Sequence, residues 1–157
     1  LTANASANKI KLTLNPNGGS GGTTAVWYYY GTSTFYSNEA CTTQITAITR
    51  PTRTGYTFSK WALNSASGTQ YSPGATIEFD NPVNIEGNKT AFAIWNRVTY
   101  TITYNLNGGT VSTANPTSYN VDSAAITLNN PTKSGYTFTG WTGSNGTTTS
   151  KTVTIKR

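Results

Sequence analysis

The sequence predicts a mainly β or α+β chain that consists of two tandem small modules with little helix. An eleven-residue string at residues 51–61 recurs at residues 131–141 with seven identical positions. A second pair of similar strings, residues 10–19 and 100–109, precedes each copy in the same order, which is typical of tandem repeats. Thr makes up about a fifth of the chain and favours pleated, half-buried strands. At most a short helical turn is expected, at residues 38–44.

Each module is predicted to open with a β-strand and a tight turn. Apolar and polar residues alternate over residues 10–14 and, in the same phase, over residues 100–104, which indicates half-buried strands. Asn-Gly-Gly follows at residues 17–19 and 107–109. Asn-Gly favours turns whose central residues have positive φ angles, so we expect the chain to reverse there.

The eleven-residue string is predicted to be a turn followed by a strand. Pro51 and Pro131 fix φ, and Gly55 and Gly135 supply the flexible turn position before Tyr-Thr-Phe begins a strand. Three pairs of aromatic residues should then occupy equivalent core positions: Tyr56 and Tyr136, Phe58 and Phe138, and Trp61 and Trp141.

Strict alternation along this strand would place Trp61 on the face opposite to Phe58. Either the sheet is covered on both faces at this point, or a β-bulge at Lys60 and Gly140 turns the Trp toward the other aromatic residues. We favour the bulge.

The first module contains an aromatic hairpin that the second module lacks. Ten more residues separate the two strings in the first module, and the difference falls in or near residues 26–36. The candidate ligand-binding residues lie here: Trp27, Tyr28, Tyr29, Tyr30, Phe35 and Tyr36. Because alternate side chains leave opposite faces of a strand, one aromatic pair is expected to be exposed, and flat exposed aromatics suit sugar rings or a partner protein. The alternative is a sheet covered on both faces, or burial against the neighbouring module.

The repeats also predict the domain boundaries, which are an N-terminal tail or linker at 1–8, module 1 at 9–97 and module 2 at 98–157. A buried strand at residues 90–95 is predicted to end module 1. Aligning residues 71–77 with residues 149–155 places the last given residue before the counterpart of that strand. We therefore expect module 2 to be truncated before its last strand, which either continues in the parent protein or is replaced by another segment.

The composition argues against several classes of protein. The net charge is +6, but the eleven basic residues are scattered singly, unlike the basic patch of a nucleic-acid-binding protein. No stretch approaches the roughly 18 apolar residues of a membrane span. The chain has no His and a single Cys, so neither a disulfide framework nor a Cys/His metal cluster is expected.

The recurring blocks resemble the Listeria–Bacteroides repeat family, the internalin B B-repeat-like modules of bacterial surface proteins. The resemblance rests on Asn-Gly-Gly in both modules, on residues 51–58 and 131–138 with the Trp that follows each, and on the aromatic strand that ends at Trp95. It implies a small β-grasp-like (ubiquitin-like) fold in secreted proteins of the cell wall. It also implies a stalk or adhesion role without catalytic residues or cofactors. The aromatic hairpin of module 1 departs from the internalin form.

Three sets of residues have the type or spacing that covalent or catalytic chemistry requires. Glu78 and Asp80 would share one face of a strand about 6–7 Å apart, within reach of a glycosidase pair, but a solvated strand face is the expected reading. Cys41 and Gln44 have the spacing of some internal thioesters, but a lone thiol that behaves as a small apolar residue in a loop is the expected reading. Lys11 and Lys60 are strand lysines that could form isopeptide bonds, but both fall on polar positions.

We therefore predict a non-enzymatic, extracellular module of a bacterial cell-surface protein that acts as a stalk, spacer or adhesion element. A carbohydrate-binding module that uses the aromatic hairpin is the alternative. The expected partners are neighbouring modules of the parent protein and host or microbial glycans or surface proteins, with no nucleic acid, no metal and no cofactor.

Overall fold

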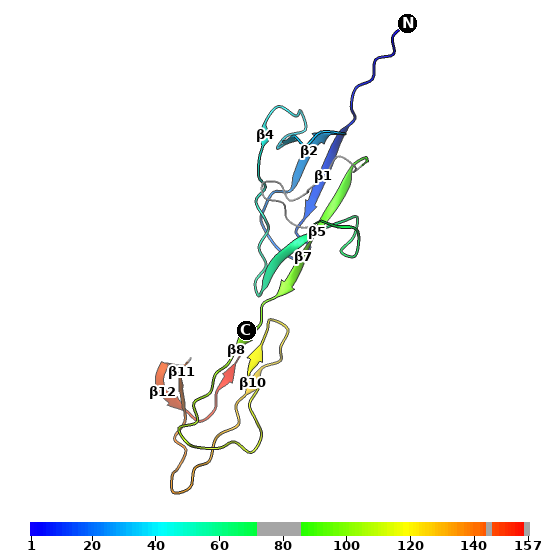
Figure 1. Cartoon of the computed structure of the whole chain (residues 1–157). Helices are drawn as coiled ribbons and strands as arrows, with labels where there is room; N and C mark the ends of the chain where they lie inside the picture. Colours follow the sequence, from blue (N-terminus) through cyan, green and yellow to red (C-terminus); the bar gives the residue numbers. More distant parts are fainter. Residues whose placement is uncertain (72–85, 144–145, 156–157) are drawn as a thin grey trace. The chain divides into compact units, whose positions relative to one another are not determined.

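The chain divides into two compact units, Leu1–Asn96 and Arg97–Arg157. The computed structural model describes residues 1–71, 86–143 and 146–155 (Figure 1). Every regular element in these ranges is a β-strand, so the predicted mainly β class is confirmed. The segment expected to form a short helical turn contains a tight turn instead, in which the N–H of Cys41 donates to the carbonyl of Asn38 at 3.0 Å.

The described strands of the first unit form one sheet in the order β4-β3-β2-β1-β7-β5-β6. Its strands are β1 (Lys9–Asn15), β2 (Ala25–Tyr29), β3 (Phe35–Tyr36), β4 (Gln44–Ile45), β5 (Tyr56–Leu63), β6 (Gln70–Tyr71) and β7 (Lys89–Arg97). β1, β2, β3 and β4 pair antiparallel in succession. The strands predicted at residues 10–14 and 90–95, and the aromatic hairpin between residues 26 and 36, are thus confirmed.

The centre of this sheet is a parallel pair between segments far apart in the sequence. β1 pairs with β7 from Leu12 opposite Lys89 to Asn15 opposite Phe92. The two strands lie side by side in Figure 1. Both alternate in burial, since β1 buries Ile10 and Leu12 while β7 buries Ala91 and Ala93. Small residues on β7 allow larger side chains of the neighbouring strands to fill the space above them.

The hydrophobic core belongs to the first unit. Its buried members come from five strands and are Ile10, Leu12, Leu14, Val26, Tyr28, Phe35, Trp61, Leu63, Ala91 and Ala93. Phe58 and Trp95 pack against this cluster while partly exposed. At about 25 cal/mol per Å² of apolar area, burial of these side chains is the main source of stability for the unit.

The end of β5 departs from strict alternation. Phe58 and Trp61 lie three positions apart, yet their ring centroids are 5.1 Å apart, so both rings lie toward the same side. Trp61, Ala62 and Leu63 are all buried in succession, which shows that the sheet is covered on both faces where β5 ends. In the second unit Gly140 has φ 144°, a conformation that favours glycine, and the pairing that follows it is irregular between Trp141 and Gly143.

The described strands of the second unit form three separate two-stranded pairs. Its strands are β8 (Tyr100–Thr101), β9 (Ser118–Tyr119), β10 (Ile126–Thr127), β11 (Trp141–Gly143), β12 (Gly146–Ser150) and β13 (Thr154–Ile155). β8 pairs with β9, β10 with β13, and β11 with β12, all antiparallel. The strand predicted over residues 100–104 is therefore shorter than expected, because only Tyr100 and Thr101 have a strand partner among the described residues.

The predicted equivalence of core positions is wrong for one aromatic pair and holds incompletely for the others. Tyr56 is partly exposed and Tyr136 is 71% exposed, so these tyrosines do not belong to a core. Phe138 and Trp141 repeat the ring contact of the first unit at 5.6 Å. However, both are only partly buried, and the described part of the second unit contributes no Leu, Ile, Val, Ala or aromatic residue to the buried hydrophobic core.

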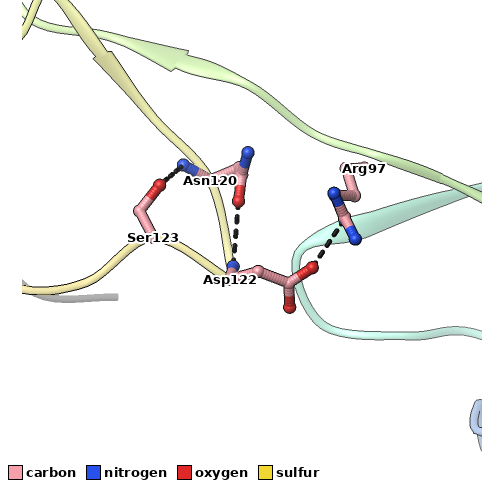
Figure 2. Close-up of polar contacts among 4 residues, drawn as sticks. All are labelled: Arg97, Asn120, Asp122 and Ser123. Carbon is pink, nitrogen blue, oxygen red and sulfur yellow. Dashed lines mark hydrogen bonds and ion pairs between the residues drawn. The ribbon is translucent and has the colours of Figure 1, made fainter.

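Local hydrogen bonds order the loop between β9 and β10 (Figure 2). The side-chain carbonyl of Asn120 accepts from the N–H of Asp122 at 2.9 Å, and the Ser123 hydroxyl accepts from the N–H of Asn120 at 2.9 Å. This turn presents the Asp122 carboxylate to Arg97, whose Nε lies 2.6 Å from it. Both side chains are about half exposed, so the ion pair contributes at most about 1 kcal/mol.

Candidate functional site

The six aromatic residues of the hairpin divide between the core and the surface. Tyr28 and Phe35 are buried, with ring centroids 5.4 Å apart. A ligand could not reach these two without opening the core. Tyr30 follows the end of β2 and is 41% exposed, and its N–H donates to the carbonyl of Asn8.

The remaining three, Trp27, Tyr29 and Tyr36, form an outer aromatic face on β2 and β3. Trp27 is directly opposite Tyr36 in the ladder, and the rings of Tyr29 and Tyr36 meet edge to face at 6.4 Å. Because Trp27 and Tyr29 alternate with the buried Val26 and Tyr28, they leave the sheet on the side away from the core.

Lysines of β1 adjoin this face. Lys11 is the ladder partner of Trp27, and its ammonium lies 5.6 Å from the indole centroid, a cation–π distance. Lys9 is the ladder partner of Tyr29 and donates to the backbone carbonyl of Glu39 at 2.8 Å. The hairpin sequence alone could not reveal these lysines, because they come from another strand.

The loop after β3 places a thiol beside the outer aromatic face. Cys41 has φ 53° and is a free thiol, and its charge when ionised raises the pKa of the Tyr29 hydroxyl. Gln44, the other residue of the proposed thioester, pairs with Tyr36 in β4. Lys11 is exposed rather than buried as an isopeptide lysine would be. The Glu78–Asp80 pair lies outside the described residues.

A second constellation occurs in both units and is termed here the turn clamp: residues 15–20 with 51–56, and residues 105–110 with 131–136. Its opening turn is the predicted Asn-Gly turn, since Asn17 and Asn107 have φ 46° and 50°. The N–H of Gly19 donates to the carbonyl of Pro16 at 2.9 Å, and that of Gly109 to Leu106 at 2.8 Å. The predicted reversal is confirmed in both copies.

Backbone hydrogen bonds join each turn to the proline string. Ser20 and Thr52 exchange two N–H···O bonds of 2.8 and 2.9 Å, and Thr110 and Thr132 exchange two of 2.8 Å. These bridges hold two segments together that are separated by about thirty residues in one unit and about twenty in the other, so the clamp closes a long loop in each.

A cation stacks on a tyrosine in each clamp. The guanidinium carbon of Arg53 lies 3.9 Å from the Tyr56 ring centroid, and the Lys133 ammonium lies 4.4 Å from that of Tyr136. The sequence contains the signal for this contact in the Arg/Lys exchange three positions before each Tyr, although we assigned these tyrosines to the core. Gly18 lies against the same guanidinium, because a Cβ there would be 3.4 Å from it.

Trp95 connects the clamp of the first unit to β7. Its indole N–H donates to the carbonyls of Pro16 and Asn17, both at 3.1 Å. The Asn17 side-chain amide donates to the carbonyl of Ala93 at 2.8 Å. Sequence reasoning recognised Trp95 as the end of a strand but did not connect it with the Asn-Gly turn.

Residues 1–71, 86–143 and 146–155 contain no group of three or more metal-ligating side chains. In the same ranges, no helix is long and apolar enough to cross a membrane.

The sequence profile of the Listeria-Bacteroides repeat domain matches residues 11–94 and 100–157. No curated protein sequence and no solved structure gives a significant match to the chain. Repeats of this family are non-catalytic and typical of bacterial surface proteins. The two profile matches span most of the chain and contain both turn clamps, so this chain belongs to the Listeria-Bacteroides repeat family.

Proposed function

We propose that this chain is a spacer or adhesion segment of a secreted protein on the bacterial cell wall and that it has no enzymatic activity. The observation that carries the proposal is the turn clamp, which has the same backbone bonds and cation–tyrosine contact in both units. The polar groups of the clamp bind one another, which is expected if the clamp stabilises the fold of each repeat. The expected partners are neighbouring modules of the same protein.

The sheet of the first unit supports the predicted β-grasp-like arrangement. β1 and β7 pair in parallel at its centre, and β2 pairs antiparallel on the other side of β1. A parallel pair of this kind needs a long crossover, which here includes β5 and β6 rather than a helix among the described residues.

The outer aromatic face favours glycan binding as a second function. Trp27, Tyr29 and Tyr36 offer a row of rings on one side of the sheet, and aromatic rings stack on the apolar faces of sugars. Lys11 covers part of the Trp27 ring, but it is an exposed, flexible side chain that a ligand could displace.

Titration with polysaccharides separates the two functions. The 157-residue chain is incubated with bacterial and host glycans, and tryptophan fluorescence and glycan-array binding are measured. A saturable change that Trp27→Ala abolishes, and that Tyr136→Ala retains, would establish the glycan-binding function. Tyr136 is the matched control because it is the most exposed aromatic residue described and belongs to the other unit.

The spacer function predicts no glycan binding in this titration, and it predicts a measurable effect in a second experiment, in which the chain is replaced by a linker. No glycan should give a saturable change. When the chain is placed between a surface anchor and a binding domain, replacing it with an unstructured linker of equal length should reduce capture of the binding domain's ligand at the cell surface. Equal capture with both linkers would contradict the spacer role.

A further inference from the structure

The outer aromatic face continues as a single row of side chains across four strands. Its members face one another in the ladders of β1, β2, β3 and β4, in the order Lys11, Trp27, Tyr36 and Gln44. Directly opposed residues of antiparallel strands leave the sheet on the same face, and neighbouring strands lie about 4.8 Å apart. The row therefore presents an ammonium group, two aromatic rings and a carboxamide at intervals of about 5 Å.

The lysines at one end of the row have no acidic partner in the part of the chain that the structure describes. Lys9 and Lys11 are both exposed. Lys9 donates to the backbone carbonyl of Glu39, and Lys11 lies over the Trp27 ring. The Glu39 carboxylate is exposed and forms no ion pair with either lysine. Two positive charges therefore remain available at this end, and they favour a ligand with negative charge.

A sugar that stacks on Trp27 has to displace the Lys11 ammonium, which lies 5.6 Å from the ring centroid. A neutral sugar would leave the displaced ammonium with only water in place of the ring. An acidic group on the stacked sugar, or on the next one, would replace the cation–π contact with a charge-assisted hydrogen bond. The position of Lys11 thus disfavours neutral sugars and favours acidic ones.

We propose that the outer aromatic face binds an acidic polysaccharide that contains uronic acids, an inference that rests on the glycan-binding function proposed above. The sugar chain follows the row and stacks on Trp27 and Tyr36. Its carboxylates pair with Lys9 and Lys11, and the Gln44 carboxamide binds sugar hydroxyls. A uronic acid carries its carboxylate on the sugar ring itself, so the charge lies close to the ammonium beside the ring on which the sugar stacks.

A single-stranded nucleic acid also combines stacking rings with negative charge, but this face suits it less well. Proteins that bind single strands follow the phosphate backbone with a positively charged groove. Here both lysines belong to β1, at one end of the row, and the neutral Gln44 is at the other end. The positive charge therefore does not follow the row of rings.

The test compares oligogalacturonates, which are oligomers of a uronic acid, with their methyl esters, in which the same sugars have no charge. The unaltered 157-residue chain is titrated with each, and binding is measured by tryptophan fluorescence and calorimetry. We expect the acid to bind about tenfold more tightly than the ester at low ionic strength, because two exposed charge pairs form. In 1 M NaCl the two affinities should become nearly equal, because salt screens these pairs.

Matched lysine variants locate the charge that the acid recognises. Lys11→Gln keeps most of the side-chain stem and removes the charge, so it should weaken binding of the acid by about threefold to fivefold. Binding of the ester should not weaken. Lys151→Gln removes the same charge from an exposed position of the second unit and should bind the acid as the unaltered chain does.

The outcomes separate this inference from the function on which it rests. Equal binding of acid and ester, or a loss in Lys151→Gln as large as that in Lys11→Gln, would overturn the inference and leave glycan binding in place. Equally tight binding of oligothymidylate would show a face for any polyanion and would also overturn it. Binding of neither acid nor ester would overturn the inference, and glycan binding falls with it only if no glycan of the array binds. The acid–ester comparison uses the unaltered chain, so it does not depend on the folding of a variant.

Discussion

Trp61 and Trp141 occupy the same place in the repeat, and their surroundings differ. Each contacts the Phe three positions earlier, at 5.1 and 5.6 Å. Trp61 is nevertheless fully buried, while Trp141 lines an open groove. In the first unit β7 lies beside β5, whereas among the described residues of the second unit β11 pairs with β12 alone. The contacts made within a string are local and form in both units, whereas burial requires a strand from a distant part of the sequence.

The turn clamp, unlike the burial of these tryptophans, is the same in both units. Its turn, its backbone bridge and its cation–tyrosine contact are nearly identical in the two units. Its residues lie within the two recurring strings or, for Ser20 and Thr110, directly after the first of them, and its backbone bridge and cation–tyrosine contact involve no third segment.

The largest difference between the units is expected for matched core truncations. Leu12 is fully buried in the first unit, and its counterpart Ile102 lines the groove of the second. Leu12→Ala should lower the free energy of unfolding of the first unit by about 2–5 kcal/mol, and Ile102→Ala that of the second by about 1 kcal/mol, because little apolar contact is lost there. Urea unfolding followed by circular dichroism of the full chain measures both. Equal losses would show that the second unit has a core of its own.

Matched glycine substitutions test the role of Trp95 more narrowly. At Gly19 a Cβ would lie 2.5 Å from the Trp95 ring and 2.8 Å from the carbonyl of Thr52. Gly19→Ala should therefore destabilise the first unit by about 2 kcal/mol through overpacking. Gly109→Ala meets its nearest atoms at 3.1 Å and should cost less than about 1 kcal/mol. Thermal unfolding of the two variants provides the comparison, and the reverse order would contradict the assigned packing.

The pH dependence of the stability of the second unit tests whether Tyr104 is partly buried, as its raised pKa indicates. Partial burial raises the pKa of Tyr104 above its ordinary value of 10.0. A tyrosine with a raised folded-state pKa contributes stability that is present below pH 10 and is lost as the pH rises through the folded-state pKa. Tyr104→Phe should therefore lose less stability between pH 8 and about pH 11 than the unaltered chain does. Tyr100→Phe is the control, because Tyr100 is 44% exposed. Identical pH profiles of the Tyr104→Phe variant and the unaltered chain would contradict this.

The smallest effect is expected at the Arg97–Asp122 ion pair. Both side chains are about half exposed, and Asp122→Asn should change the stability of the second unit by at most about 1 kcal/mol. The difference should shrink further in 1 M NaCl, where screening is strong. A larger loss that salt does not reduce would assign Asp122 a role in the turn rather than in the ion pair.

Local signals predicted the parts of this fold that are local. Alternation identified β1, residues 90–95 were predicted as a buried strand that corresponds to β7, and Asn-Gly identified both turns with their positive φ angles. The same reasoning placed Tyr56 in the core, because a strand pattern does not reveal that Arg53 stacks on its ring. Alternation placed Tyr28 on the face opposite to Trp27 and Tyr29, but it could not tell which of the two faces is buried, because that depends on how the strands far apart in the sequence pack. The binding role of these residues stays a prediction.

The parallel pairing of β1 and β7 has a mechanical consequence for the first unit. β1 begins at Lys9 and β7 ends at Arg97, so a force that pulls the chain at these two ends acts along both strands in opposite directions. The ladder is then loaded in shear, and its evenly spaced bonds share the load instead of opening one after another. In single-molecule stretching, we expect the first unit to unfold at a higher force than the second, whose described strands include no parallel pair. Under tension, the chain would yield first at the second unit, whose described strands form only two-stranded pairs.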